Sequence, residues 1–200
     1  SSIPMSFFEF AGLEVTSNNE IIVGGNFYGL VDFDLSSGGV DTLRSHQPTY
    51  PDYFVSKYTA TGNLIWAFSI GEAVSSGIKM KSLNLMPNDN ILVSANPTGV
   101  VDVDPGPAVH NTTSGFSNNQ VICYDSGGNY VWNKKINVTY SYAIPGSTIA
   151  ADASGNVYVL SVGYYEMTIT KFDPAGSYLT YKTFGNFASG GRVDPATILI

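Results

Sequence analysis

The sequence predicts an all-β fold, a partial β-propeller of about three four-stranded antiparallel blades plus one strand of a fourth. Three observations support this prediction. Segments of the chain recur, short apolar segments alternate with clusters of Gly, Asn, Asp and Pro, and no window keeps the 3.6-residue apolar period of a helix.

The clearest recurrence lies in the first half of the chain, where residues 20–34 match residues 90–104. The match aligns Gly29 with Gly99, and it aligns two aspartates of the first copy, Asp32 and Asp34, with Asp102 and Asp104. A separation of 70 residues between equivalent positions is typical of a repeated supersecondary unit rather than of a chance match.

A second block follows in each copy, since residues 55–66 match residues 121–132. The match aligns paired turn residues and one tryptophan of each copy: Gly62, Asn63 and Trp66 with Gly128, Asn129 and Trp132. We expect the Gly and Asn residues to supply positive φ in hairpin turns. The tryptophans are most simply packing residues on fourth strands.

A third, shorter copy begins at Asn156, and its second block places Thr180 where the other copies have tryptophan. Its four strands are expected at residues 147–151, 157–162, 168–172 and 178–184. The predicted units are blade 1 with an Asp-bearing insertion at residues 1–71, blade 2 with a similar insertion at 72–137, a minimal blade 3 at 138–187, and the first strand of a further blade at 188–200.

Such a blade cannot bury both faces alone, and propellers close with four to eight blades. The expected partners are therefore a protein partner or the remaining blades of a longer chain, and we favour a longer chain. A homodimer that completes the ring is the alternative, with about six to seven blades in total.

The first two copies resemble bacterial SBBP-type β-propeller repeats. The matching segments are residues 25–34, 54–58, 62–67 and 101–106. The resemblance implies propeller architecture in an exported or cell-surface protein, often one that uses type IX secretion, and it implies no single activity.

The composition excludes some classes of partner. The net charge is −7, which argues against nucleic acid and against an anionic membrane surface. No apolar stretch approaches the roughly 20 residues that a membrane-spanning helix needs, so we expect no membrane insertion.

Asp32 with Asp34, and Asp102 with Asp104, are the candidate metal residues. On a strand, positions i and i+2 share a face, and paired carboxylates there suit a hard cation such as Ca²⁺, which is the candidate cofactor. The main alternative is a solvent-facing acidic strand edge that discourages edge pairing. A glycosidase pair is a third interpretation, and the duplication argues for structure over catalysis.

Other reactive residues have simpler explanations. Cys123 lies in an apolar strand and is interpreted as a buried small hydrophobe. Its catalytic use would need a histidine, and both histidines, His46 and His110, are expected in polar loops. A tyrosine cluster is a candidate for stacking on sugars or anchoring a partner, with strand packing as the alternative: Tyr140, Tyr142, Tyr164 and Tyr165.

The sequence therefore predicts a non-catalytic propeller segment of an exported bacterial protein, acting as a scaffold or protein-interaction module. The alternative is a propeller that binds or cleaves carbohydrate. Specific recognition is expected on the insertions around residues 30–52 and 100–119.

Overall fold

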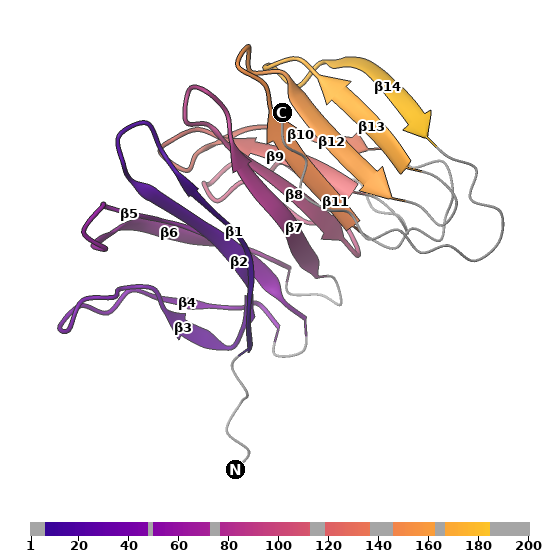
Figure 1. Cartoon of the computed structure of the whole chain (residues 1–200). Helices are drawn as coiled ribbons and strands as arrows, with labels where there is room; N and C mark the ends of the chain where they lie inside the picture. The colour runs from indigo at the N-terminus through magenta and orange to yellow at the C-terminus, as the bar shows by residue number, and fades with distance from the viewer. Residues whose placement is uncertain are drawn as a thin grey trace.

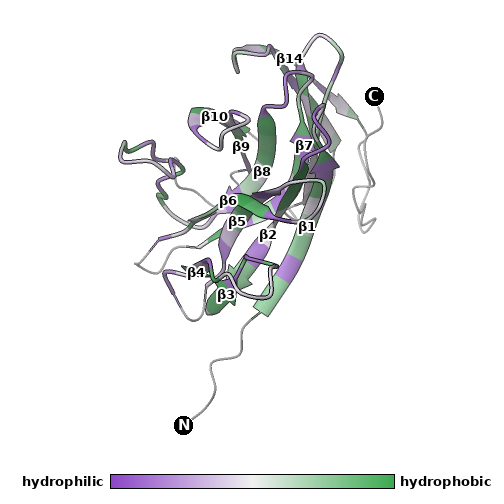
Figure 2. Cartoon of the chain, turned by 90° about the vertical axis from the view of Figure 1, so that its left-hand side faces the viewer, coloured by the Kyte–Doolittle hydropathy of each residue, from purple (hydrophilic) through white to green (hydrophobic). Residues whose placement is uncertain are grey.

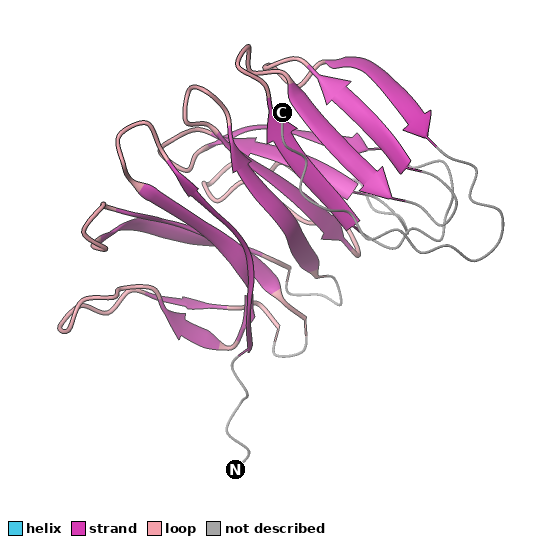
Figure 3. Ribbon diagram, in the orientation of Figure 1, coloured by secondary structure: helices cyan, strands magenta, loops and turns pink. Residues whose placement is uncertain are grey.

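A computed structural model describes residues 7–47, 50–72, 77–112, 119–136, 146–162 and 167–184. Within these ranges all regular secondary structure is β-strand, and no helix is present (Figure 3). The all-β prediction is therefore confirmed for the described part of the chain. In the same ranges no helix is long and apolar enough to cross a bilayer.

The first sheet has four antiparallel strands in the order β1-β2-β5-β6. Its strands are β1 (Phe7–Val15), β2 (Ile21–Tyr28), β5 (Asp52–Tyr58) and β6 (Leu64–Ile70). Between β2 and β5 the insertion forms a two-stranded ribbon of β3 (Leu30–Asp32) and β4 (Thr42–Arg44).

The second sheet repeats this pattern with β7 (Ile78–Leu85), β8 (Ile91–Pro97), β9 (Asn119–Tyr124) and β10 (Tyr130–Ile136), in chain order. In the described part of its insertion, an isolated bridge joins Asp102 and Asn111, where the first insertion has a ribbon. The third sheet has β11 (Gly146–Ala151), β12 (Val157–Val162), β13 (Met167–Phe172) and β14 (Tyr178–Phe184), again in chain order.

The three sheets lie beside one another in chain order, and each pair of neighbours shares an apolar core (Figure 1). Between the first and second sheets, side chains such as Ile22, Tyr53 and Ile122 are fully buried. Between the second and third, Val121 and Val159 are equally buried. Because each sheet covers a face of the next, burial of apolar area holds the stack together.

A smaller core lies on the opposite side of the first sheet. There the β3–β4 ribbon packs through Phe33 against Phe27 and Phe54, with ring centroids 5.9 and 4.9 Å from that of Phe33. These aromatic contacts explain why an insertion with a short, polar tip has a fixed place on the sheet.

The predicted strands of the third copy are all present within one residue of the expected bounds. The strand expected within residues 188–200 lies outside the described residues, as does the tyrosine cluster: Tyr140, Tyr142, Tyr164 and Tyr165.

Candidate functional site

Both Asp-bearing insertions are folded by hydrogen bonds between their carboxylates and their own backbone. In the first, Oδ1 of Asp32 accepts from the backbone N–H groups of Asp34 and Asp41 at 3.0 and 2.9 Å. Oδ1 of Asp34 then accepts from the N–H of Ser36 at 2.8 Å. Such bonds build tight turns and give the backbone an alternative to strand pairing.

The second insertion repeats this arrangement. Oδ1 of Asp102 accepts from the N–H groups of Asp104 and His110 at 3.1 and 2.9 Å, and Oδ1 of Asp104 accepts from the N–H of Gly106 at 2.7 Å. The aligned aspartates therefore perform the same local task in both copies.

The idea that both aspartates of a pair lie on one strand is wrong. Asp32 is the last residue of β3 and Asp34 lies beyond it, while Asp102 forms an isolated bridge and Asp104 lies in a loop. The physical reason is the turn itself, because each carboxylate bends back to backbone donors. Among the described residues, no three His, Cys, Asp or Glu side chains are grouped to hold a metal. A calcium role for these residues stays a prediction.

A tyrosine hydroxyl on a strand of the same sheet, β5 or β9, donates a hydrogen bond to each turn. The hydroxyl of Tyr58 donates to the carbonyl of Phe33 at 3.1 Å, and that of Tyr124 donates to the carbonyl of Val103 at 2.8 Å. Each acceptor is the residue between the two aspartates. Tyr124 also hydrogen-bonds to the hydroxyl of Tyr53, and burial raises the pKa of both phenols.

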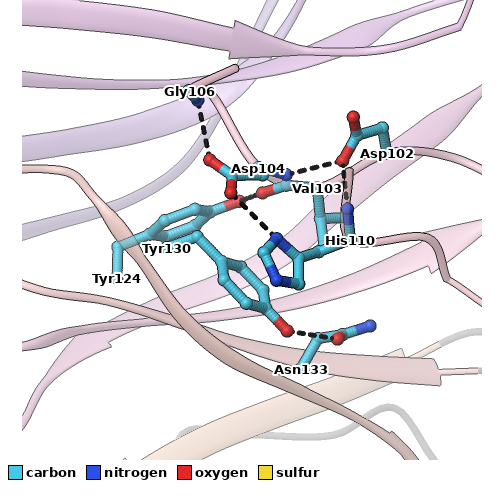
Figure 4. A network of polar contacts seen from close by, with 8 residues as sticks. All are labelled: Asp102, Val103, Asp104, Gly106, His110, Tyr124, Tyr130 and Asn133. Atoms are coloured by element: carbon cyan, nitrogen blue, oxygen red, sulfur yellow. Dashed lines mark hydrogen bonds and ion pairs between the residues drawn. The ribbon is translucent and has the colours of Figure 1, made fainter. Parts of the chain in front are cut away.

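In the second insertion this network continues to a histidine (Figure 4). Nδ1 of His110 lies 2.8 Å from Oδ2 of Asp104, and the imidazole stacks on the ring of Tyr130 with centroids 4.0 Å apart. Tyr130 in turn donates its hydroxyl proton to Oδ1 of Asn133 at 2.7 Å. Burial raises the pKa of Tyr130. The result is a half-exposed imidazole held by a carboxylate and an aromatic ring.

His46 has a similar partner in the first sheet. Its Nδ1 lies 2.7 Å from Oδ2 of Asp52, which also accepts from the His46 N–H at 3.0 Å. Burial raises the pKa of Asp52, and the hydrogen bonds from His46 act in the opposite direction. The carboxylate thus anchors the end of the insertion to the start of β5.

A cleft lies between the second and third sheets, with a volume of about 330 Å³. Its walls combine hydroxyl groups, aromatic rings and a lysine, contributed by β10, β13 and β14: Lys135, Ile136, Thr168, Thr170, Phe172, Tyr178 and Tyr181. Tyr178 and Tyr181 are exposed. Sequence reasoning missed this cleft because its residues come from two sheets whose packing the repeat pattern does not specify.

The aligned glycines and tryptophans meet across the sheets. Gly62 and Gly128 have a φ of +86°, as expected for turn residues. A Cβ on Gly128 would lie 3.4 Å from the Trp66 ring, and one on Gly176 would lie 2.7 Å from that of Trp132. Each tryptophan therefore packs on a turn of the next sheet, and Trp132 is 7% exposed.

The other aligned turn residues behave less uniformly. Gly29 has a φ of +94°, whereas positive φ is not found at its counterpart Gly99. Asn63 and Asn129 do not adopt positive φ either. The carbonyl of Asn63 closes its turn by accepting from the Thr59 N–H at 2.9 Å, and the carbonyl of Asn129 accepts from the Asp125 N–H at 2.8 Å. The prediction that these two asparagines supply positive φ is therefore wrong.

Cys123 is fully buried, and burial raises the pKa of its thiol to about 12. It packs in the core between the second and third sheets, whereas Tyr124 packs between the first and second. Consecutive strand residues point to opposite faces, so the thiol lies on the other side of the sheet from the His110 network.

Comparison with known proteins found no family model that matches the chain and no curated protein that matches it. The resemblance to SBBP-type repeats therefore stays a prediction that rests on the quoted segments.

Proposed function

We propose that the chain is a non-catalytic segment of a β-propeller that serves as a scaffold or protein-interaction module in an exported bacterial protein. One observation carries this proposal: three four-stranded sheets with the same chain-order topology pack side by side, and at both interfaces a tryptophan packs on a turn glycine of the next sheet. A sector of a propeller has this organisation, because each blade covers its neighbour.

The hydrogen bonds of the insertions favour a structural role over catalysis. Both described histidine side chains are held by carboxylates, and the carboxylates of Asp102 and Asp104 are committed to backbone N–H groups of the same loop. A general acid or base needs a proton acceptor or donor directed at a substrate. Oδ1 of Asp102 and Oδ1 of Asp104 accept from the backbone instead, and Oδ2 of Asp104 pairs with the imidazole of the same loop, which supports assigning these carboxylates to loop formation.

Export and surface location rest on the sequence resemblance alone. The segments at residues 25–34 and 101–106 carry that resemblance, and the turn geometry just described gives a physical reason for their Asp-x-Asp pattern.

The proposal is tested by screening the purified chain against a broad panel of polysaccharides and ester substrates. We expect no turnover above buffer. Turnover that disappears in both Asp104→Asn and His110→Ala, with both variants folded by circular dichroism, would overturn the non-catalytic assignment.

Carbohydrate binding is the second candidate function, and the cleft between the second and third sheets favours it. A volume of about 330 Å³ lies at the lower end of the range for small-molecule sites, and exposed aromatic rings stack on sugars. A glycan array compares the chain with Tyr181→Ala. Binding that the substitution abolishes would support this function, and an array without hits would count against it.

A further inference from the structure

The outer face of the first sheet exposes a row of apolar side chains along β1. Phe8, Phe10, Leu13 and Val15 are 51, 57, 53 and 55% exposed. A β-bulge between Phe10 and Gly12 keeps all four on one face. Figure 2 looks onto this end of the molecule, where β1 runs along the right of the first sheet and the β3–β4 ribbon lies to the left of its lower end.

The same row exists in the second sheet, where it is covered. Seventy residues further on, β7 carries Ile78, Met80, Leu83 and Leu85, with a bulge at the equivalent place. Ile78, Met80 and Leu83 are 0, 2 and 6% exposed and belong to the core against the first sheet, and the partly buried Leu85 packs against that core. The row on β1 therefore has the side chains and spacing of a surface that binds a neighbouring sheet.

The covering sheet contributes small residues and an indole. A Cβ on Gly24 would lie 2.6 Å from Cδ1 of Leu83, so the absence of a side chain there makes room for β7. At the far end, Trp66 packs on the turn glycine Gly128, as Trp132 does on Gly176. The third glycine of this series, Gly62, has nothing within 4 Å of a Cβ position.

Polar contacts across the first two sheets follow the same register. Asn26 holds the backbone of Met80, donating to its carbonyl at 3.0 Å and accepting from its N–H at 2.7 Å. Lys57 donates to the carbonyl of Ser126 at 3.1 Å. By the repeat alignment, the counterparts on the outer face of the first sheet are the backbone of Phe10 and the carbonyl of Ala60.

We propose that the outer face of the first sheet binds another four-stranded sheet of this repeat, one that presents an indole from its fourth strand to Gly62. This inference rests on the proposed propeller architecture and adds the identity of the partner. The partner also carries a small residue facing Leu13, an asparagine facing the Phe10 backbone and a lysine facing Ala60.

The third sheet of a second copy does not have these features. At the positions of Trp66 and Phe68, β14 carries Thr180 and Lys182, and its side chains are exposed along its whole length. The occupant is therefore a sheet of the first or second type, not the end of a second copy of the chain.

A gain-of-function experiment duplicates residues 7–77 directly ahead of Phe8, in the register in which they precede Ile78. We expect the duplicate to cover the original β1 row, so that the fusion unfolds in one transition with a higher urea midpoint than the chain. The duplicate exposes a β1 row of its own, so the substitution Phe10→Cys in the original copy reports the covering; its thiol should be protected from a thiol reagent in the fusion and reactive in the chain. The matched control replaces the tryptophan equivalent to Trp66 in the duplicate by threonine, which should lower the urea midpoint and reduce this protection. A folded duplicate that unfolds separately, with this thiol unprotected, would overturn the proposal.

A second variant does not depend on the duplicate folding. The double substitution Thr180→Trp and Lys182→Phe places an indole on the exposed third sheet of the intact chain. We expect light scattering to show concentration-dependent dimers, which Gly62→Arg dissociates. Persistent monomers of the double variant would contradict the proposal. Dimers of the unaltered chain that Phe10→Lys dissociates would instead make a second copy the occupant. Neither result bears on the screen against polysaccharide and ester substrates, which tests the non-catalytic role separately.

Discussion

Alanine at three matched turn glycines measures what the contact between a tryptophan and the next sheet contributes to stability. Gly62, Gly128 and Gly176 have φ values of +86°, +86° and +77°. Alanine in the left-handed region costs about 1–2 kcal/mol, and the restriction of the unfolded chain offsets roughly 0.4–1 kcal/mol of this. A substitution with no further consequence should therefore lower the free energy of unfolding by about 1 kcal/mol.

The surroundings of the three glycines differ. A Cβ at Gly62 meets nothing within 4 Å, and one at Gly128 meets Trp66 at an ordinary contact distance of 3.4 Å. At Gly176 the Cβ would lie 2.7 Å from Cδ2 of the buried Trp132, and such overpacking costs about 1–3 kcal/mol. We predict losses of about 1 kcal/mol for Gly62→Ala and Gly128→Ala, and about 2–4 kcal/mol for Gly176→Ala.

Urea unfolding followed by far-ultraviolet circular dichroism measures these losses, with equal m-values as the condition for comparing them. Combining Gly176→Ala with Trp132→Ala should remove the additional loss, because the clashing ring is gone. Equal losses at all three glycines would refute the reasoning, since the Trp132 contact would then contribute nothing.

Three further predictions concern single side chains. Burial raises the pKa of the Cys123 thiol from 9.0 to about 12, so the native protein should react with a thiolate-specific reagent at least about a thousandfold more slowly than the urea-unfolded chain; equal rates would contradict this. Burial raises the pKa of Asp52 above 3.8, so the folded state binds the carboxyl proton more tightly than the unfolded chain does. The contribution of Asp52 to the free energy of unfolding therefore declines as the pH rises from 3.8 through the folded pKa. Asp52→Asn should therefore gain stability relative to the parent across that window, and a difference in urea midpoint that is independent of pH would be the contrary result. Asp102→Ala removes the acceptor of two backbone hydrogen bonds and should cost about 1–3 kcal/mol, whereas Asp102→Asn keeps an oxygen and should cost less; equal losses together with a Ca²⁺-dependent midpoint in the parent would favour the metal site.

The repeat alignment predicted the sheets well because strand order follows from turn spacing. Consecutive strands joined by short turns pair with one another, so the strands of the third copy, residues 147–151 through 178–184, could be placed from Gly and Asp positions alone. The alignment also contained the supporting tyrosines, since Tyr58 and Tyr124 occupy the same place in the second block of each copy.

The candidate site was harder to predict, because side-chain direction in a turn depends on backbone donors that the sequence does not place. Treating Asp32 and Asp34 as strand residues implied two carboxylates projecting together, whereas each accepts from a backbone N–H two residues further on. His110 lies in a loop and stacks on Tyr130, the first residue of β10. The two residues are too far apart in the sequence for a local pattern to predict this contact.

The insertions also contribute apolar side chains to the packing of the sheets, which their polar sequences do not indicate. Val101 and Val103 are fully buried in the core between the first two sheets, and Phe33 is buried against the outer face of the first. An insertion thus extends the face that its sheet turns toward the preceding sheet. Packing between sheets therefore uses the same surface as the insertion, and we expect a partner that binds residues 30–44 to contact the β1 row as well. A substitution at Phe10 should for this reason disturb a partner of the ribbon, while the cleft at Tyr181, on the far side of the second sheet, should be unaffected.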